Sequence, residues 1–171
     1  MCNLKKYINL IQRNNDVIAA LVFILFFIAT VYFDRRMDLA FGIISWEEIM
    51  DSNLSYQQIF PYWDAMWNFY YVSILILLTL ASRSLIPMIW GLIVQHFAIE
   101  DMAYFVFNNL NFPENFNFLR NNILIGLSKI LGFEMITLQT LLISSVIGII
   151  LGVFTTFIYI KVKKMVTSRR H

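Results

Sequence analysis

The stretch VIAALVFILFFIATVYF, residues 17–33, contains no charged side chain in seventeen consecutive positions. A bilayer core about 30 Å thick is crossed by roughly 17–25 helical residues, so this stretch is long enough to span it. A basic segment precedes it, as in a signal peptide, but it ends in TVYFDRR without a small-residue cleavage pattern. The sequence therefore predicts a retained transmembrane helix at residues 17–33.

Three further uncharged runs follow along the chain, at residues 65–82, 84–99 and 135–160. The chain is 59% hydrophobic and only 14% charged, whereas soluble domains carry about 25% charged residues. We predict an all-α, polytopic membrane protein that forms a single domain, residues 1–171. Its four transmembrane helices are expected at approximately residues 17–33, 63–82, 85–107 and 136–160. Three spans are the alternative if the third run turns back before it crosses.

The two outer connections carry amphipathic patterns. Apolar residues recur at steps of three and four in both, a spacing typical of helices with one apolar face: Leu39, Ile43, Trp46 and Met50 in the first, and Leu119, Ile123, Leu127 and Leu131 in the second. We expect a short interfacial helix in each connection, with Ser128 off the apolar stripe of the second.

Basic residues indicate the orientation. The N-terminal segment, the short SRS connection around Arg83 and the C-terminal tail together hold nine of the thirteen Lys and Arg residues. Cytoplasmic loops are enriched in Lys and Arg, so both termini and the SRS turn are predicted to face the cytoplasm. We expect an integral protein of the cell (plasma) membrane, with the lipid bilayer as its first partner.

A stripe of small residues runs along the fourth predicted helix at four-residue steps: Thr140, Ser144, Gly148, Gly152 and Thr156. Small residues let two helices approach closely, and Gly148 with Gly152 forms a G-x-x-x-G pattern. The stripe predicts a helix–helix contact. We expect that contact inside the bundle, and the alternative is contact with a second copy or another membrane protein.

A polar layer is predicted where the third run ends, in QHFAIEDMAYF, residues 95–105. If SRS is a tight turn, Asp64 lies nineteen residues before Arg83, while Glu100 and Asp101 lie seventeen and eighteen after it. At 1.5 Å per residue, these carboxylates are expected at nearly the same depth, near the outer boundary. Residues of like spacing on the two helices complete the predicted ligand-binding set: Asp64, Asn68, Tyr71, His96, Glu100, Asp101 and Tyr104.

Several functions suit such a layer. Adjacent Glu100 and Asp101 repel each other when both are ionised, which favours binding of a cation or small polar ligand with participation of a proton. His96 and Glu100, four residues apart, could instead hold a divalent transition metal, such as zinc, iron or manganese. The protein would then be an enzyme acting on a lipid or isoprenoid headgroup, with Asp101 or Asp64 as the base.

Two less specific interpretations stay open. The carboxylates can simply end a helix in the hydrated headgroup region, or the protein can be a structural or assembly subunit without a site of its own. The sequence contains no G-x-S-x-G or H-E-x-x-H motif, so whether it is an enzyme is undecided. It also contains no Gly-rich phosphate loop and no nucleic-acid-binding module, so nucleic acid is not an expected partner.

Overall fold

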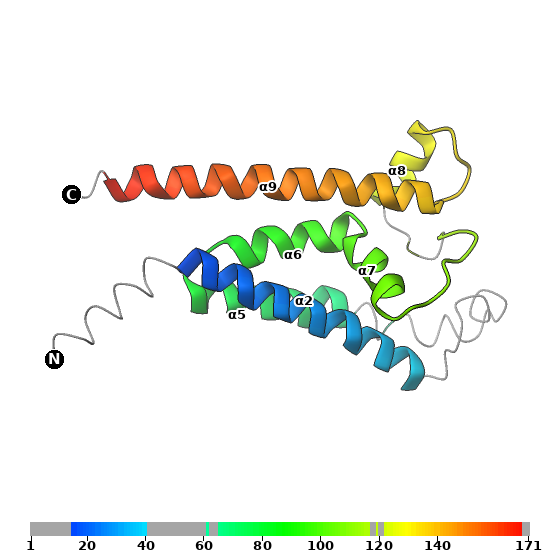
Figure 1. Cartoon of the computed structure of the whole chain (residues 1–171), viewed down its shortest axis with the longest axis horizontal. Helices are drawn as coiled ribbons and strands as arrows, with labels where there is room; N and C mark the ends of the chain where they lie inside the picture. Colours follow the sequence, from blue (N-terminus) through cyan, green and yellow to red (C-terminus); the bar gives the residue numbers. More distant parts are fainter. Residues whose placement is uncertain (1–14, 41–60, 62–64, 117–118, 120–121, 169–171) are drawn as a thin grey trace.

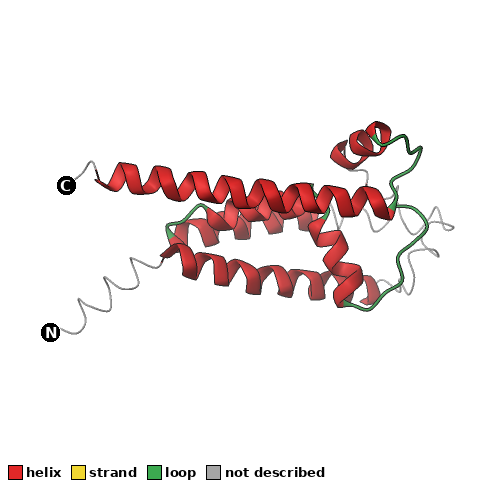
Figure 2. Ribbon diagram, turned by 45° about the horizontal axis from the view of Figure 1, so that its top comes forward, coloured by secondary structure: helices red, strands yellow, loops and turns green. Residues whose placement is uncertain are grey.

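The computed structural model describes residues 15–40, 61, 65–116, 119 and 122–168. These residues form helices and loops, with no strand among them (Figure 2). Two helices are long and apolar enough to cross a membrane, α2 (Asn15–Ala40) and α9 (Leu138–Ser168), each with a window of mean hydropathy 2.5. Only 17% of the most apolar stretch of α2 and 22% of that of α9 are buried, so most of their apolar side chains face outward. This surface supports a location in a membrane.

The second and third predicted spans form a helical hairpin. A π-helix, η1 (Met66–Tyr71), leads into α5 (Val72–Ser82), and α6 (Ile86–His96) returns after the turn. Arg83 ends α5 in the left-handed conformation with φ 51°, and Pro87 lies in the first turn of α6. The predicted tight SRS turn is therefore confirmed. The two arms are shorter than the long helices, at 17 residues for Met66–Ser82 and 11 for α6.

The third predicted span is not one continuous helix. It breaks at Phe97 and Ala98, and α7 (Ile99–Phe107) begins after the break. Ala98 is left-handed, with φ 57°, and fully buried. The backbone oxygens of Phe97 and Ala98 both accept the hydroxyl of Ser145 on α9, at 3.4 and 3.3 Å. The oxygen of Ala98 also accepts the backbone N–H of Met102, at 3.1 Å, so the hydroxyl of Ser145 adds a contact from another helix to carbonyl groups at the break.

Helix α6 occupies the middle of the bundle. It packs against α9 on one side and against α2 and α5 on the other (Figure 1). The N-terminal end of α2, the α5–α6 turn and the C-terminal end of α9 lie at one end of the molecule. Helices α7 and α8 (Asn122–Ile130) lie at the other end. The structure thus has a basic end and an opposite end that holds the segment after the helix break.

The small-residue stripe of α9 faces α6 and the helix break. A Cβ atom built on Gly152 would lie 2.7 Å from the indole of Trp90, and one on Gly148 would lie 2.5 Å from Cβ of Phe97. Nε1 of Trp90 also donates a hydrogen bond to Oγ1 of Thr156, at 3.1 Å. The contact observed for the stripe is therefore the one inside the bundle.

The outer connections differ from the prediction in two respects. In α8 the buried side chains are Leu124 and Ser128, whereas Ile123 is 38% exposed, so the predicted apolar stripe is not the buried face. Ser128 faces α9, and its hydroxyl lies 3.0 Å from that of Thr140, so the buried serine has a hydrogen-bond partner. The first connection begins later than predicted, since α2 continues to Ala40. The amphipathic helix predicted after it falls mainly on residues 41–60, outside the described residues.

Candidate functional site

The predicted polar face of the second span is only partly present. Asp64 lies outside the described residues. Asn68 is exposed, whereas Tyr71 is buried and its hydroxyl donates to the backbone oxygen of Gly91 at 3.3 Å. The prediction assumed α-helical spacing, but both residues belong to η1, whose i→i+5 bonds turn successive side chains by a different angle. Asn68 and Tyr71 therefore do not share a face.

His96 and Glu100 also lie in different environments. His96 is exposed and its Nδ1 donates to the backbone oxygen of Leu92 at 2.9 Å, whereas Glu100 is only 7% exposed. The break at Ala98 separates the two residues, so the i, i+4 relation of a continuous helix does not hold. Among the described residues, no group of three His, Cys, Asp or Glu side chains is placed to hold a metal ion.

Glu100 instead faces acidic residues of α2. The charges of Asp34 and Asp38 both act on Glu100, as does that of its neighbour Asp101, which is half-buried. Asp38 is fully buried and Asp34 is 8% exposed. Glu100 also acts electrostatically on the buried Tyr71. Carboxyl groups of α2 and α7, two helices in contact, therefore lie near one another.

Hydrogen bonding connects this group of residues. The hydroxyl of Tyr104 on α7 donates to Oδ2 of Asp38. The other oxygen of Asp38, Oδ1, and Oε1 of Glu100 are buried and accept no hydrogen bond from any residue that the structure describes. The positive charge of the half-buried Arg35 acts on Asp38. We call Asp34, Asp38, Glu100 and Tyr104 the acidic cluster.

The chemistry of the acidic cluster follows from burial. An ionised carboxylate loses its hydration when it is buried, at a cost of several kcal/mol, unless a cation or hydrogen-bond donors replace the water. Asp38 and Glu100 each retain one oxygen able to interact with such a group. The cluster can therefore hold a proton between carboxyl groups or bind a cation.

Asp34 and Asp38 were not among the residues predicted from the sequence. The first uncharged run ends at Phe33, so the span predicted from it ends before Asp34. A signal was nevertheless present in the helical spacing. Phe23, Phe27, Val31, Asp34 and Asp38 follow one another at steps of three and four, and every one of them is buried or half-buried in α2.

Of the predicted ligand set, the structure brings Tyr71, Glu100, Asp101 and Tyr104 into or beside the acidic cluster, whereas His96 and Asn68 point elsewhere. Asp34 and Asp38 of this cluster come from α2, a helix that the predicted ligand set does not include. No protein-family model matches the chain, and neither a curated protein nor a solved structure is similar to it.

Proposed function

We propose that this chain is a multi-pass protein of the cell membrane with four spans, formed by α2, η1 with α5, α6 with α7, and α9. The outward-facing apolar side chains of α2, α5 and α9 support this arrangement. Four spans put both ends of the chain on one side of the membrane. The start of α2, the α5–α6 turn and the end of α9 lie at one end of the molecule, and the sequence places basic residues before α2, in that turn and in the last part of α9. By the positive-inside rule, both termini are cytoplasmic and the acidic cluster is on the outer side.

We further propose that the acidic cluster binds one positive charge, either a proton or a small monovalent cation. The observation that carries this proposal is the pair of buried carboxyl oxygens, Oδ1 of Asp38 and Oε1 of Glu100, without a hydrogen-bond partner among the described residues. They come from two different helices, α2 and α7, so one bound charge would hold both helices together.

The position of the acidic cluster supports the same function. Asp34 lies seventeen residues after Val17, the first residue of the uncharged run, or about 26 Å along the helix axis, which is close to the far side of a core about 30 Å thick. The cluster also lies directly after the break in the third segment. In membrane transporters, discontinuous helices commonly form ion sites, because the ends of the half-helices and the carbonyl groups between them can contact the ion.

Two other functions have less support from this geometry. A metal-dependent reaction on a lipid or isoprenoid headgroup would require more ligands than the described residues bring together, since His96 points away from Glu100. An assembly role would place a basic side chain of a membrane partner between the carboxyl groups. The purified protein lacks the partner and its basic side chain, so its behaviour separates an assembly role from binding of a proton or small cation.

The full-length protein in detergent provides the test. Its unfolding temperature is measured by circular dichroism at several pH values and in sodium, potassium or choline chloride of equal ionic strength. We expect the unfolding temperature to rise as the pH is lowered, or, at higher pH, to be greater in sodium or potassium chloride than in choline chloride. In either case the bound proton or cation compensates the buried charge. Glu100→Gln and Asp38→Asn, which keep the shape but remove one charge, should reduce this response.

Glu114→Gln is the matched control, because Glu114 is an exposed carboxylate in the loop after α7. This variant should respond like the unaltered protein. Two results would contradict the proposal: an unaltered protein whose unfolding temperature depends on neither pH nor the cation, or an undiminished response in Glu100→Gln.

A further inference from the structure

The buried face of α2 continues from the acidic cluster to the other end of the bundle. Asp16 lies eighteen residues before Asp34, or about 27 Å along the helix axis, and Phe23 lies eleven residues before it, or about 17 Å. The face thus has a polar residue at its start, apolar residues in its middle and carboxyl groups at its end. Its residues follow at steps of three and four, and each is buried or half-buried: Asp16, Ala19, Phe23, Phe27, Val31, Asp34 and Asp38.

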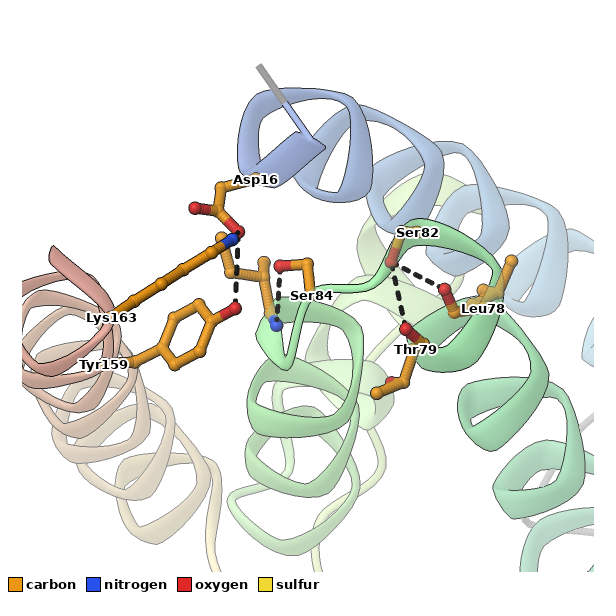
Figure 3. Close-up of polar contacts among 8 residues, drawn as sticks. Asp16, Leu78, Thr79, Ser82, Ser84, Tyr159 and Lys163 are labelled. Atoms are coloured by element: carbon orange, nitrogen blue, oxygen red, sulfur yellow. Dashed lines mark hydrogen bonds and ion pairs between the residues drawn. The ribbon is translucent and has the colours of Figure 1, made fainter. Parts of the chain in front are cut away.

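Polar contacts fix the start of this face. Nζ of Lys163 on α9 forms an ion pair with Oδ1 of Asp16, at 2.7 Å. The hydroxyl of Tyr159 donates to the same oxygen at 3.4 Å, and buried Ser84 of the α5–α6 turn lies beside them (Figure 3). Asp16 is the only acidic residue in residues 1–16, the SRS turn and residues 161–171. These contacts join the start of α2 to α9, and we call the four residues the inner tie.

An apolar layer, formed by Phe23, Leu75 and Val94, lies between the inner tie and the acidic cluster. These residues come from α2, α5 and α6, pack in one cluster and are 5%, 0% and 3% exposed. Leu75 lies against the backbone of Gly91 on α6, since a Cβ atom built on Gly91 would be 2.2 Å from Cδ1 of Leu75. Tyr71 borders the layer on the side of the acidic cluster, whose charge acts on it. Apolar side chains of three helices therefore meet inward of the carboxyl groups.

The two sides of the acidic cluster thus differ. Toward the inner tie, the apolar layer offers neither charge nor a hydrogen bond to an ion, which would lose its hydration there. At the border of the cluster, Arg35 and Asp101 are half-buried, so part of each side chain is accessible from outside the bundle. We propose that the acidic cluster exchanges its proton or cation with the outer side only, because the apolar layer closes its inner side. This inference rests on the proposed function and adds the direction from which the charge arrives.

The test measures proton flux into vesicles that contain the full chain and an enclosed pH-sensitive dye, with a potassium diffusion potential as the driving force. Vesicles with the unaltered protein should take up protons no faster than protein-free vesicles. Leu75→Asn places hydrogen-bonding groups in the apolar layer and should increase the flux at least about tenfold, since one hydrogen bond to a charged group changes a rate by that factor or more. Adding Glu100→Gln should abolish this flux, because the path then lacks a carboxyl group of the acidic cluster.

Leu77→Asn is the matched control, since it makes the same substitution on α5 at a side chain that is 63% exposed. It should not increase the flux. Val94→Thr, which adds a hydroxyl to the apolar layer with little change of shape, is the second variant in case Leu75→Asn does not fold. Circular dichroism verifies that each variant is folded.

Proton flux through the unaltered protein would overturn the proposal, as would folded Leu75→Asn and Val94→Thr variants that both carry none. A flux that Glu100→Gln leaves unchanged would also overturn it, because the protons would then bypass the acidic cluster. The dependence of the unfolding temperature on pH and cations reports separately whether the cluster binds a charge.

Discussion

The hydroxyl of Tyr104 donates a hydrogen bond to Oδ2 of Asp38, a residue 66 positions earlier in the chain, and this bond joins α7 to α2. Both residues are almost fully buried, at 3% and 0% exposure. The bond fixes how α7 lies against α2, because Tyr104 follows Glu100 by one helical turn. The acidic cluster therefore depends on a neutral donor as well as on its carboxyl groups.

Tyr104→Phe should lower the free energy of unfolding by about 1–3 kcal/mol, because Asp38 would lose the donor to one buried oxygen. The change is measured by denaturant unfolding in detergent. Tyr70→Phe is the control, since Tyr70 is 62% exposed and its loss of a hydroxyl should have little effect. Equal stabilities of the two variants would show that the bond to Asp38 contributes nothing.

Gly148→Ala should destabilise the protein by about 1–3 kcal/mol through overpacking. The new methyl group would lie 2.5 Å from Cβ and 2.9 Å from Cγ of Phe97, atoms near the backbone that cannot rotate away. Gly126→Ala in α8 meets nothing within 4 Å and should leave stability unchanged or raise it by up to about 1 kcal/mol. A comparison of their unfolding curves tests whether α9 contacts the helix break as closely as the structure shows.

Leu124→Ala should lower the free energy of unfolding by about 2–5 kcal/mol, because the side chain of Leu124 on α8 is fully buried. Ile123→Ala removes a side chain that is 38% exposed and should cost less than about 1 kcal/mol. The order of the two variants in thermal unfolding identifies the buried face of α8. If Ile123→Ala is the more destabilising change, the face predicted from the sequence is the buried one after all.

Arg83→Gly should give a protein about 0.5–1 kcal/mol more stable than Arg83→Ala. Both changes remove the same charge, but only glycine adopts the left-handed conformation with φ 51° without steric cost, which outweighs its larger loss of entropy on folding. The two unfolding temperatures are compared under identical conditions. An alanine variant as stable as the glycine variant would indicate that the turn relaxes to another conformation.

Much of the fold could be predicted because it depends on local and one-dimensional features. The lengths of the apolar runs indicate the long helices, and the SRS turn is short enough to allow only a hairpin. The stripe on α9 could be recognised because small residues at four-residue steps in an apolar helix allow a second helix to approach closely. Each of these features is recorded in a single continuous segment of the chain.

The acidic cluster was harder to predict because its geometry depends on contacts between distant residues. QHFAIE contains neither glycine nor proline, so nothing in it indicates a break, and the hydroxyl that contacts the carbonyl groups at the break comes from Ser145 on α9. The π-helix before α5 likewise changes which side chains share a face. A sequence read at 3.6 residues per turn therefore groups His96 and Asn68 with Glu100, whereas in the folded chain the acidic neighbours of Glu100 include Asp34 and Asp38.

The left-handed residue Ala98 divides the third segment into two helices, α6 and α7, that run in different directions. A continuous helix would couple the rotation of α6 to that of α7, so any change in how α6 packs on α9 would also turn Glu100. With the break in place, the direction of α7 depends on its own contacts with α2 and α9 and not on the axis of α6 alone. The packing surface of α6 can then diverge among descendants of this chain while the position of the carboxyl group on α7 is preserved.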